Sequence, residues 1–395
     1  MVSKKMKEMI ERSAALGAMF TEGKRLKELY GEENVFDFGI GNPNVKAPDA
    51  VNEAIVEILR EVDSLQIHGY TDGSGIPAAR QAIAESLNRR FGTSFSAKNL
   101  IMTVGAAGGL SVICKVLIDE GDEALTFAPY FGEYDNYVIN AGGTLLAVPP
   151  NPPSFLPDLA ALEERITAKT KAIILNSPNN PTGVVYDAET IGALAAVLER
   201  KEKELGTSIY IIADEPYREL VYDGAEAPYI PLYYHNTIVA YSFSKSLSLP
   251  GDRIGYLVIP SEVDDFADVA AGAEIANRCL GFVNAPALQQ MVVARCCDEQ
   301  TDVAYYDKNR LLLYEALTSY GYACAKPQGA FYLFVKALEP DEEAFCEKAK
   351  KHGLLMTPGK AFRCPGYVRI AYCVARETIE RSLPSFQALA QEYKN

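Results

Sequence analysis

The chain has few of the residues on which several common kinds of catalytic and metal site depend. It contains three histidines, His68, His235 and His352, and none of them lies in an HExxH motif or a recognisable catalytic triad. Its eight cysteines include the adjacent Cys296 and Cys297 but no CxxC pair. These absences argue against serine-hydrolase chemistry, zincin chemistry and a zinc site. We therefore expect no metal, and we expect the thiols to be reduced and mostly buried.

Basic residues and long apolar segments are also scarce. The sequence has 38 Lys and Arg against 52 Asp and Glu, which gives a net charge of -14 and no clustered basic surface for nucleic acid. No apolar run approaches the roughly 20 residues of a membrane span. The N-terminal segment mixes charges throughout and lacks the continuous apolar core of a secretory signal. We expect a soluble, cytoplasmic protein that binds small molecules and neither nucleic acid nor membrane.

With 395 residues, the chain exceeds the size of about 250 to 300 residues at which a single hydrophobic core usually stops growing. Apolar runs typical of buried strands alternate with helical patterns as far as RIGYLVI, which predicts a mainly parallel sheet with helices on both faces. After Pro286 the pattern turns helical and then includes the strands YLFVKA and YVRIAYC, which predicts a smaller α+β domain. The expected organisation is an N-terminal arm at 1–44 that packs with the small domain, a large domain at 45–286 and the small domain at 287–395.

The periodicity of apolar residues also predicts individual elements. One or two amphipathic helices interrupted at Gly17 are expected at 3–30. A glycine-rich loop, GAAGG, is expected at 105–109 after the strand NLIMTV. Further strands are expected at EALTFA, TLLAV, KAIILN, SIYIIAD and TIVAYS. Further helices are expected at 49–61, from Pro77 onward, and at 108–119, 158–167, 187–205, 287–319 and 341–352.

A lysine directly follows the predicted strand TIVAYS, at the end of a strand where open α/β sheets bind their ligands. Lys245 is surrounded by side chains that suit an anionic, phosphate-bearing ligand: Ser242, Ser244, Ser246 and Arg253. This combination is typical of a lysine that forms a Schiff base. A solvated Lys-Arg loop is the alternative that this segment, taken alone, leaves open.

Polar residues follow two other predicted strands. Asn180 lies in SPNNPTG after KAIILN, and Asp214 ends SIYIIAD and is followed closely by Tyr217. Because the ends of parallel strands share one edge of a sheet, these side chains and Lys245 should converge on one ligand. Such a set suits pyridoxal phosphate. Its aldehyde forms an imine with a lysine, its ring nitrogen pairs with a carboxylate, and its ring oxygen accepts from hydrogen-bond donors.

The motifs NNPTG, ADEPY and SFSKSLSLPGDRIGY together resemble those of class I/II aminotransferases, which are fold type I pyridoxal-phosphate enzymes, and the resemblance spans nearly the whole chain. It implies an α/β fold with a large cofactor-binding domain. It also implies that Lys245 is the Schiff-base lysine and that Asp214 holds the pyridine nitrogen. Tyr217 and Asn180 correspond to the residues that hydrogen-bond the ring oxygen.

The resemblance further assigns residues around the cofactor. Ser242 and Arg253 match the phosphate-binding serine and arginine of the family. The phosphate-cradling turn falls at Gly105, Ala106 and Ala107, where the chain lacks the usual hydroxyls, so backbone N-H groups would carry more of the contact. Phe131 corresponds to the aromatic ring that stacks on the pyridine, although such a residue can also be an ordinary core phenylalanine. Tyr70 resembles the tyrosine that reaches the partner's phosphate, which implies a homodimer with a shared active site.

The tail TPGKAFRCPGYVRIAY is similar to the family's C-terminal motif. In that motif the arginine corresponding to Arg369 binds the substrate α-carboxylate in a bidentate geometry that lysine cannot reproduce. Gly41, in GIGNP, would add a backbone N-H to this carboxylate, and Asn180 would also lie beside the substrate. Phe331, in PQGAFYLF, is expected near the substrate.

These assignments predict a ping-pong aminotransferase that moves an amino group between an L-amino acid and a 2-oxo acid, with Lys245 as anchor and base. Aspartate, alanine and aromatic amino acids remain open as donors, with glutamate and 2-oxoglutarate as a second pair. A C-S β-lyase acting on cysteine conjugates is the nearest alternative, because the same scaffold supports β-elimination. A non-catalytic regulatory protein that binds pyridoxal phosphate is the alternative from a different class.

Overall fold

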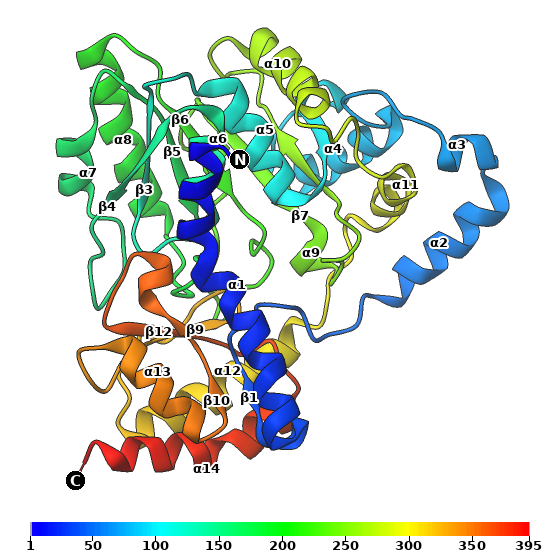
Figure 1. Ribbon diagram of the computed structural model, residues 1–395. Coiled ribbons are helices and arrows are strands. Elements are labelled where there is room, and N and C mark those ends of the chain that lie inside the picture. The colour runs from blue at the N-terminus through cyan, green and yellow to red at the C-terminus, as the bar shows by residue number, and fades with distance from the viewer. Residues whose placement is uncertain (1, 395) are drawn as a thin grey trace.

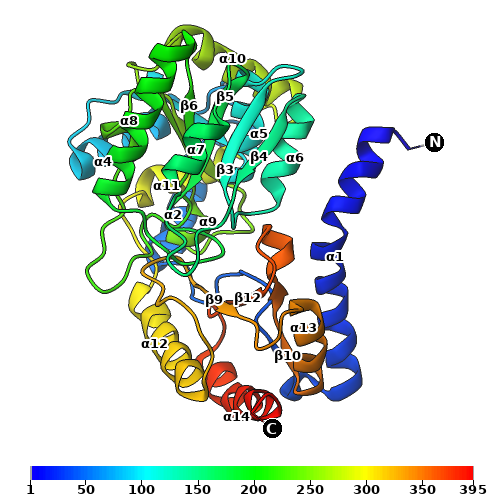
Figure 2. The ribbon, with the colours of Figure 1, turned by 90° about the vertical axis from the view of Figure 1, so that its left-hand side faces the viewer.

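A computed structural model describes residues 2–394, and within its first helix it gives no side-chain surroundings for residues 11–21. The chain forms an upper body around a large sheet and a lower body around a small one (Figures 1 and 2). The first helix runs along the side of both bodies (Figure 2). Among the described residues, none of the helices combines the length and apolar character needed to cross a membrane.

The large sheet has seven strands in the order β2-β8-β7-β6-β5-β3-β4. Only β8 runs against its neighbours β2 and β7, so the predicted mainly parallel α/β sheet is confirmed. The strands are β2 (Leu100–Thr103), β3 (Glu123–Phe127), β4 (Thr144–Val148), β5 (Thr170–Asn176), β6 (Tyr210–Asp214), β7 (Thr237–Ser242) and β8 (Gly255–Val258).

The central strands have no solvent-exposed residue because helices cover both faces of the sheet. Every residue of β6 and β7 is buried, which explains why their sequences are continuous apolar runs rather than alternating ones. One face packs on α2 (Asp49–Glu61), α4 (Pro77–Phe91), α7 (Leu159–Arg165), α8 (Ala188–Leu205) and α11 (Ala287–Cys296). The other packs on α5 (Gly105–Leu117), α6 (Glu133–Ala141) and α10 (Phe266–Cys279).

The lower body has its own apolar core, which includes Phe331, Phe345 and Phe386. Its antiparallel sheet has the order β11-β12-β9, and a short parallel pair joins β1 to β10. The strands are β1 (Phe36–Asp37), β9 (Tyr332–Lys336), β10 (Leu354–Leu355), β11 (Thr357–Pro358) and β12 (Tyr367–Ala371). The helices are α12 (Val303–Tyr320), α13 (Glu342–Lys351) and α14 (Arg376–Glu392). The proposed division of the chain at residues 44 and 286 stays a prediction.

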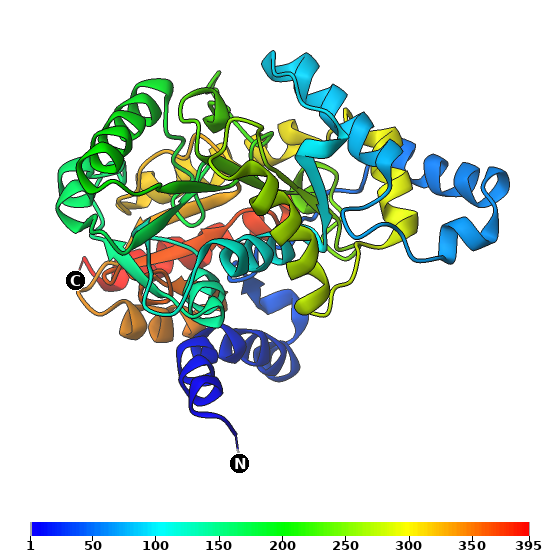
Figure 3. The same ribbon diagram turned by 90° about the horizontal axis from the view of Figure 1, so that it is seen from above.

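The N-terminal segment forms one continuous helix, α1 (Lys4–Tyr30), so of the one or two helices expected there the structure has one, without an interruption at Gly17. Near its end, Glu22 pairs with Lys350 of α13. Near its start, the Lys5 ammonium donates to the backbone oxygen of Asn140 in α6, at 3.0 Å. The view from above shows α1 at the edge of the molecule beside α6 (Figure 3). The helix therefore contacts both bodies.

Two element predictions are wrong. The expected loop at 105–109 is the start of α5, which begins at Gly105. Glycine is a poor helix former, but here it permits tight packing, since a Cβ atom at Gly109 would lie 3.2 Å from the Leu257 side chain. The expected helix at 287–319 is split into α11 and α12. The sequence analysis also missed α3 (Ser64–His68), α6, α10 and α14.

The packing of α14 leads to a prediction about stability. Phe386 is 0% exposed and contacts the rings of Phe38 and Tyr322. Replacing Phe386 with Ala should lower the free energy of unfolding by about 3 to 5 kcal/mol, because it leaves a cavity. Phe386→Leu, which keeps most of the volume, should cost less than about 1.5 kcal/mol. Urea denaturation at matched protein concentration measures both, and equal losses for the two variants would contradict this packing.

Candidate active site

A cavity of about 730 Å³ lies at the carboxyl ends of β5, β6 and β7, and residues of the lower body close its other side. The structure brings together eleven of the thirteen predicted site residues in its walls: Gly41, Ala106, Ala107, Phe131, Asn180, Asp214, Tyr217, Ser242, Lys245, Arg253 and Arg369. The twelfth, Gly105, lies directly behind Arg253. The thirteenth, Tyr70, lies outside the cavity with its side chain 91% exposed.

Lys245 reaches the cavity from α9 (Phe243–Ser246), a single turn that follows β7. Its Nζ donates to the backbone oxygen of Gly41 at 2.9 Å and lies 5.1 Å from the centre of the Phe331 ring. Burial lowers the pKa of Lys245 to about 8, with a smaller contribution from the nearby charges of Arg369 and Arg253. A larger share of this amine is therefore neutral near pH 7 than of an ordinary lysine.

Asp214 ends β6, and the described residues leave one of its carboxylate oxygens without a partner. Its Oδ2 accepts a hydrogen bond of 2.5 Å from the Tyr134 hydroxyl, whereas Oδ1 is buried and accepts none from them. Burial raises the pKa of Asp214 to about 7, against the opposing effect of the Tyr134 hydrogen bond. A protonated ring nitrogen would supply both the missing donor and a compensating charge. The predicted partner of a pyridinium therefore fits this position.

Arg369 projects from β12 into the cavity and is held from several sides. Its Nη1 donates to Oδ1 of Asn180 at 3.0 Å, and its Nη2 donates to the backbone oxygen of Gly39 at 2.7 Å. The guanidinium lies over the rings of Tyr332 and Phe362, at 4.5 and 4.8 Å from their centres. These acceptors are neutral, and Nε is buried without a partner. The arginine is thus fixed in orientation, and a carboxylate ligand would complete its hydrogen bonds.

Tyr217 follows Asp214 in the same turn. Its hydroxyl lies 2.9 Å from that of Tyr332, and burial raises its pKa well above the usual range. The phenol therefore stays protonated and can donate a hydrogen bond. Asn180 is fixed by its backbone N-H, which donates to Oδ1 of Asn176 at 2.7 Å.

The other end of the cavity gathers hydroxyl and N-H groups around Arg253. The hydroxyls of Ser242 and Ser244 are 2.6 Å apart. Gly105 has a φ of +71°, and a Cβ atom there would lie 2.8 Å from Nη2 of Arg253, so only glycine fits. Because α5 begins at Gly105, its first N-H groups have no partner within the helix and lie beside this arginine. The arrangement fits a phosphate group, which the helix N-H groups and the arginine would bind in place of side-chain hydroxyls.

Three tyrosines that line the cavity, Tyr134, Tyr137 and Tyr332, were not predicted from the sequence. Tyr134 holds Asp214, and Tyr332 contacts both Tyr217 and Arg369. Tyr134 and Tyr332 lie close to residues that the resemblance had already selected, since Tyr134 comes three residues after Phe131 and Tyr332 lies within PQGAFYLF. Phe131, beside them, packs edge-on against Tyr134 with the ring centres 5.8 Å apart. The available signal was therefore their closeness in the sequence to Phe131 and Phe331, but the local sequence does not indicate which groups these tyrosines contact.

The mainly parallel sheet and this set of residues define a pyridoxal-phosphate enzyme of fold type I, and comparisons with known proteins agree. The sequence pattern of the family Aminotransferase class I and II matches residues 33–386. A probable aspartate/prephenate aminotransferase of Thermus aquaticus is 32% identical over 360 residues, which cover 88% of this chain and 90% of that protein.

Solved structures show the same relationship. An amino transferase from Eubacterium rectale has 50% sequence identity and a TM-score of 0.97, covering 100% of this chain and 99% of that one. The aspartate aminotransferase of Thermus thermophilus, solved with maleate, has 27% identity and a TM-score of 0.86, covering 98% and 99% of the two chains. The chain belongs to the class I and II aminotransferase family. It is a pyridoxal-phosphate-dependent aminotransferase that acts on amino acids and 2-oxo acids.

The burial of Asp214 leads to a prediction about the apoprotein. The pKa of Asp214 is about 7 in the folded chain and about 3.9 in an unfolded one. Between these values the folded chain keeps a proton that the unfolded chain has lost, so the stability that this group contributes falls as the pH rises through that window. Asp214→Asn removes the titration. The melting temperature of the variant minus that of the wild type should therefore rise from pH 4 to 7 and stay constant above pH 7.

Calorimetry of both apoproteins across this pH range measures the difference. Asp265→Asn is a matched control, because Asp265 is exposed and its positive φ of 54° suits both residue types. A constant difference between Asp214→Asn and wild type at all pH values would show that Asp214 titrates normally.

Proposed function

We propose that this aminotransferase takes L-aspartate as an amino donor and a 2-oxo acid as acceptor, with Lys245 as the catalytic base. The observation that carries the proposal is the convergence of Lys245, Asp214 and Arg369 on one cavity, where Asp214 and Arg369 are buried, Lys245 is partly buried and none is paired with another. These are an amine, a carboxylate and a guanidinium, the three groups that the chemistry needs.

Bound pyridoxal phosphate supplies the electron sink that lets a proton leave the substrate Cα. The chain's own residues place the reacting atoms. Lys245 anchors the cofactor and then removes the Cα proton, a task that its lowered pKa favours because the neutral amine is the active form. Asp214 holds the ring nitrogen in its protonated form, and Tyr217 donates to the ring oxygen.

The remaining residues orient the ligands. Arg369 binds the α-carboxylate of the substrate, with Asn180 and the backbone N-H of Gly41 beside it. Gly41 is required there, because a Cβ atom at this position would lie 2.2 Å from the Tyr332 hydroxyl. Phe131 packs on the ring of the cofactor. The phosphate is held by Ser242, Arg253 and the helix start at Gly105, Ala106 and Ala107.

Aspartate as donor rests on the names of relatives, which include aspartate/prephenate and aspartate aminotransferases. Among the described residues that line the cavity, the cations are Lys245, Arg253 and Arg369, and each already has a task. The second carboxylate of aspartate therefore needs a cation from another chain. We propose a homodimer in which the exposed Tyr70 reaches the partner's phosphate, and a cytoplasmic location in amino-acid biosynthesis.

The experiment that tests the donor is a single-turnover panel. The holoenzyme is mixed with aspartate, glutamate, alanine and phenylalanine, and the loss of cofactor absorbance is followed for each. Aspartate should react with the highest rate constant per molar. A faster reaction with alanine or phenylalanine would overturn the choice of donor. Release of pyruvate and ammonia from a cysteine conjugate, without any acceptor acid, would favour the C-S β-lyase instead.

The proposed task of Arg369 gives a second prediction. Arg369→Lys keeps the charge but loses the planar pair of donors, so kcat/KM for the amino acid should fall by roughly 10²-fold or more, mainly through KM. Steady-state kinetics measure the split. Arg376→Lys, at a half-exposed arginine paired with Glu380, is the control and should leave both constants unchanged. Unchanged KM in Arg369→Lys would remove Arg369 from carboxylate binding.

A further inference from the structure

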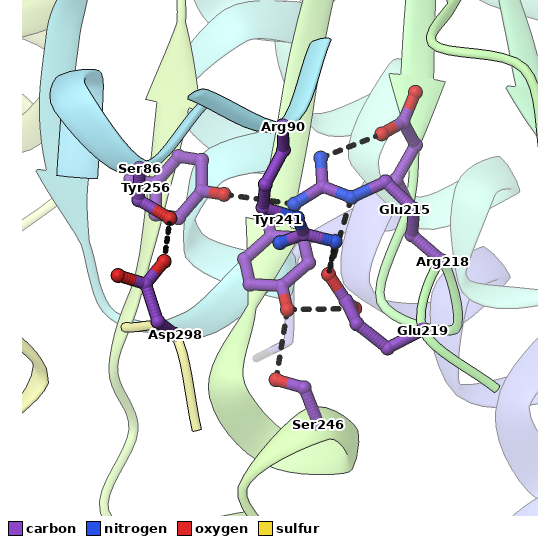
Figure 4. A network of polar contacts seen from close by, with 9 residues as sticks. All are labelled: Ser86, Arg90, Glu215, Arg218, Glu219, Tyr241, Ser246, Tyr256 and Asp298. Carbon is purple, nitrogen blue, oxygen red and sulfur yellow. Dashed lines mark hydrogen bonds and ion pairs between the residues drawn. The ribbon is translucent and has the colours of Figure 1, made fainter. Parts of the chain in front are cut away.

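A polar cluster outside the cavity joins α4, the segment that follows β6, the strands β7 and β8, and the end of α9 (Figure 4). We call it the Arg218 cluster, and its members are Arg90, Glu215, Arg218, Glu219, Tyr241, Ser246 and Tyr256. The proposed mechanism uses none of these residues. Except for Arg90, their side chains are buried, and Arg90, Glu219, Tyr241 and Ser246 line a second, smaller cavity of about 290 Å³.

Arg218 occupies the centre of the cluster. Its Nη1 donates to Glu215 at 3.0 Å, its Nε to Glu219 at 3.3 Å and its Nη2 to the Tyr256 hydroxyl at 3.1 Å. Its guanidinium also lies 4.4 Å from the centre of the Tyr241 ring. Arg90, from α4, is a second cation beside Glu219, and its Nη2 donates to Oε1 of Glu219 at 2.8 Å. Both glutamates are thereby fixed in orientation.

Tyr241 connects this cluster to the lysine turn. Its hydroxyl is 2.8 Å from a carboxylate oxygen of Glu219 and 2.8 Å from the hydroxyl of Ser246. Tyr241 lies in β7 and Ser246 ends α9, so the contact between their hydroxyls joins the two ends of the short segment that contains Lys245. The Ser246 backbone oxygen is held as well, by the N-H of Thr301 at 2.7 Å.

The same two segments serve the cavity and the cluster with neighbouring residues. In one segment, Asp214 and Tyr217 line the cavity, whereas Glu215 and Arg218 join the cluster. In the other segment, Ser242, Ser244 and Lys245 line the cavity, whereas Tyr241 and Ser246 belong to the cluster. A displacement of either segment would therefore move a cavity residue and its neighbour in the cluster together.

A purely structural role is the competing explanation. Buried ion pairs often contribute little net stability, because the charges lose their hydration, and well-packed apolar side chains can replace them at no cost. Geometric precision, however, matters greatly at a catalytic centre, where a displacement of about 1 Å can cost 10²-fold in rate. The cluster's links to the two catalytic segments favour a role in placing them.

We propose that Tyr241 and Ser246 are positioning residues, through which the Arg218 cluster fixes the lysine turn relative to the segment of Asp214. The inference rests on the proposed role of Lys245 as anchor and base. It adds that the placement of this lysine depends on a hydroxyl contact on the opposite side of its turn. Neither residue touches the cavity that the substrate would occupy.

The test removes the Tyr241 hydroxyl and keeps the ring against Arg218. In Tyr241→Phe, kcat should fall about tenfold, while KM for the amino acid stays within about twofold because Arg369 is untouched. The pH midpoint of the absorbance of bound pyridoxal phosphate should rise by at least about 0.5 units. When the cofactor is bound, the Lys245 nitrogen is the imine nitrogen, and a less constrained lysine turn lets it move away from the nearby charges of Arg369 and Arg253, which disfavour a proton at this position.

Tyr322→Phe is the matched control. Its hydroxyl is also buried and donates to the backbone oxygen of Phe386 at 2.9 Å, far from Lys245 in the chain and outside the cavity. It should lower the melting temperature about as much as Tyr241→Phe does, and it should leave the absorbance titration unchanged. An equal shift in both variants, or none in Tyr241→Phe, would overturn the positioning role.

A double-mutant cycle completes the test. Ser246→Ala should reproduce the spectral shift of Tyr241→Phe, and the double variant should shift no further, because both changes remove the contact between Tyr241 and Ser246, and the contact with Glu219, which only Tyr241→Phe removes, does not bear on the lysine turn. Additive shifts would show that the two hydroxyls act independently and would overturn the proposal. If the wild type itself does not attach the cofactor at Lys245, the proposed function fails, which is a different result from an unchanged titration in the variants.

Discussion

The register of β5, β6 and β7 is the constraint on which the site depends. Asn176 lies opposite Asp214, and Asp214 lies opposite Ala240, so the polar residues that follow these strands gather at one edge of the sheet. Because successive residues of a strand point to opposite faces, a slip of one residue would turn Asp214 away from the cavity and bring Glu215 toward it. The buried apolar strands hold this register, so packing in the sheet decides where the catalytic groups lie.

Lys245, Asp214 and Arg369 line the cavity, and the hydrogen-bond partners that the described residues give them are neutral. Lys245 donates to a backbone oxygen, Asp214 accepts from a tyrosine, and Arg369 donates to an amide and a backbone oxygen. Burial shifts the pKa values of Lys245 and Asp214 toward neutrality for this reason. Such groups oppose folding on their own, and a ligand that carries a ring nitrogen and a carboxylate would compensate their charges. The substrate and cofactor complete an arrangement that the fold holds ready.

Much of this could be predicted from sequence, because the strands are continuous apolar runs and the residues at their ends form spaced motifs. The start of α5 at Gly105 was missed, since the glycines at 105–109 are explained only by close packing on the sheet. Tyr134 and Tyr332 were missed because their contacts are distant in the chain, 80 residues from Asp214 and 115 from Tyr217. The Arg218 cluster was missed for the same reason. Local patterns identify the groups that do chemistry better than the residues that position them.

The central claim is that Lys245, and no other lysine, is the covalent anchor of pyridoxal phosphate. Borohydride reduction of the holoenzyme, followed by proteolysis and mass spectrometry of the peptides, tests it most directly. The account predicts that the reduced cofactor is found on the peptide containing Lys245 and that Lys245→Ala yields no labelled peptide at this position. A stoichiometric label on another lysine of the wild type, or no label on a protein that carries the cofactor's absorbance, would contradict it.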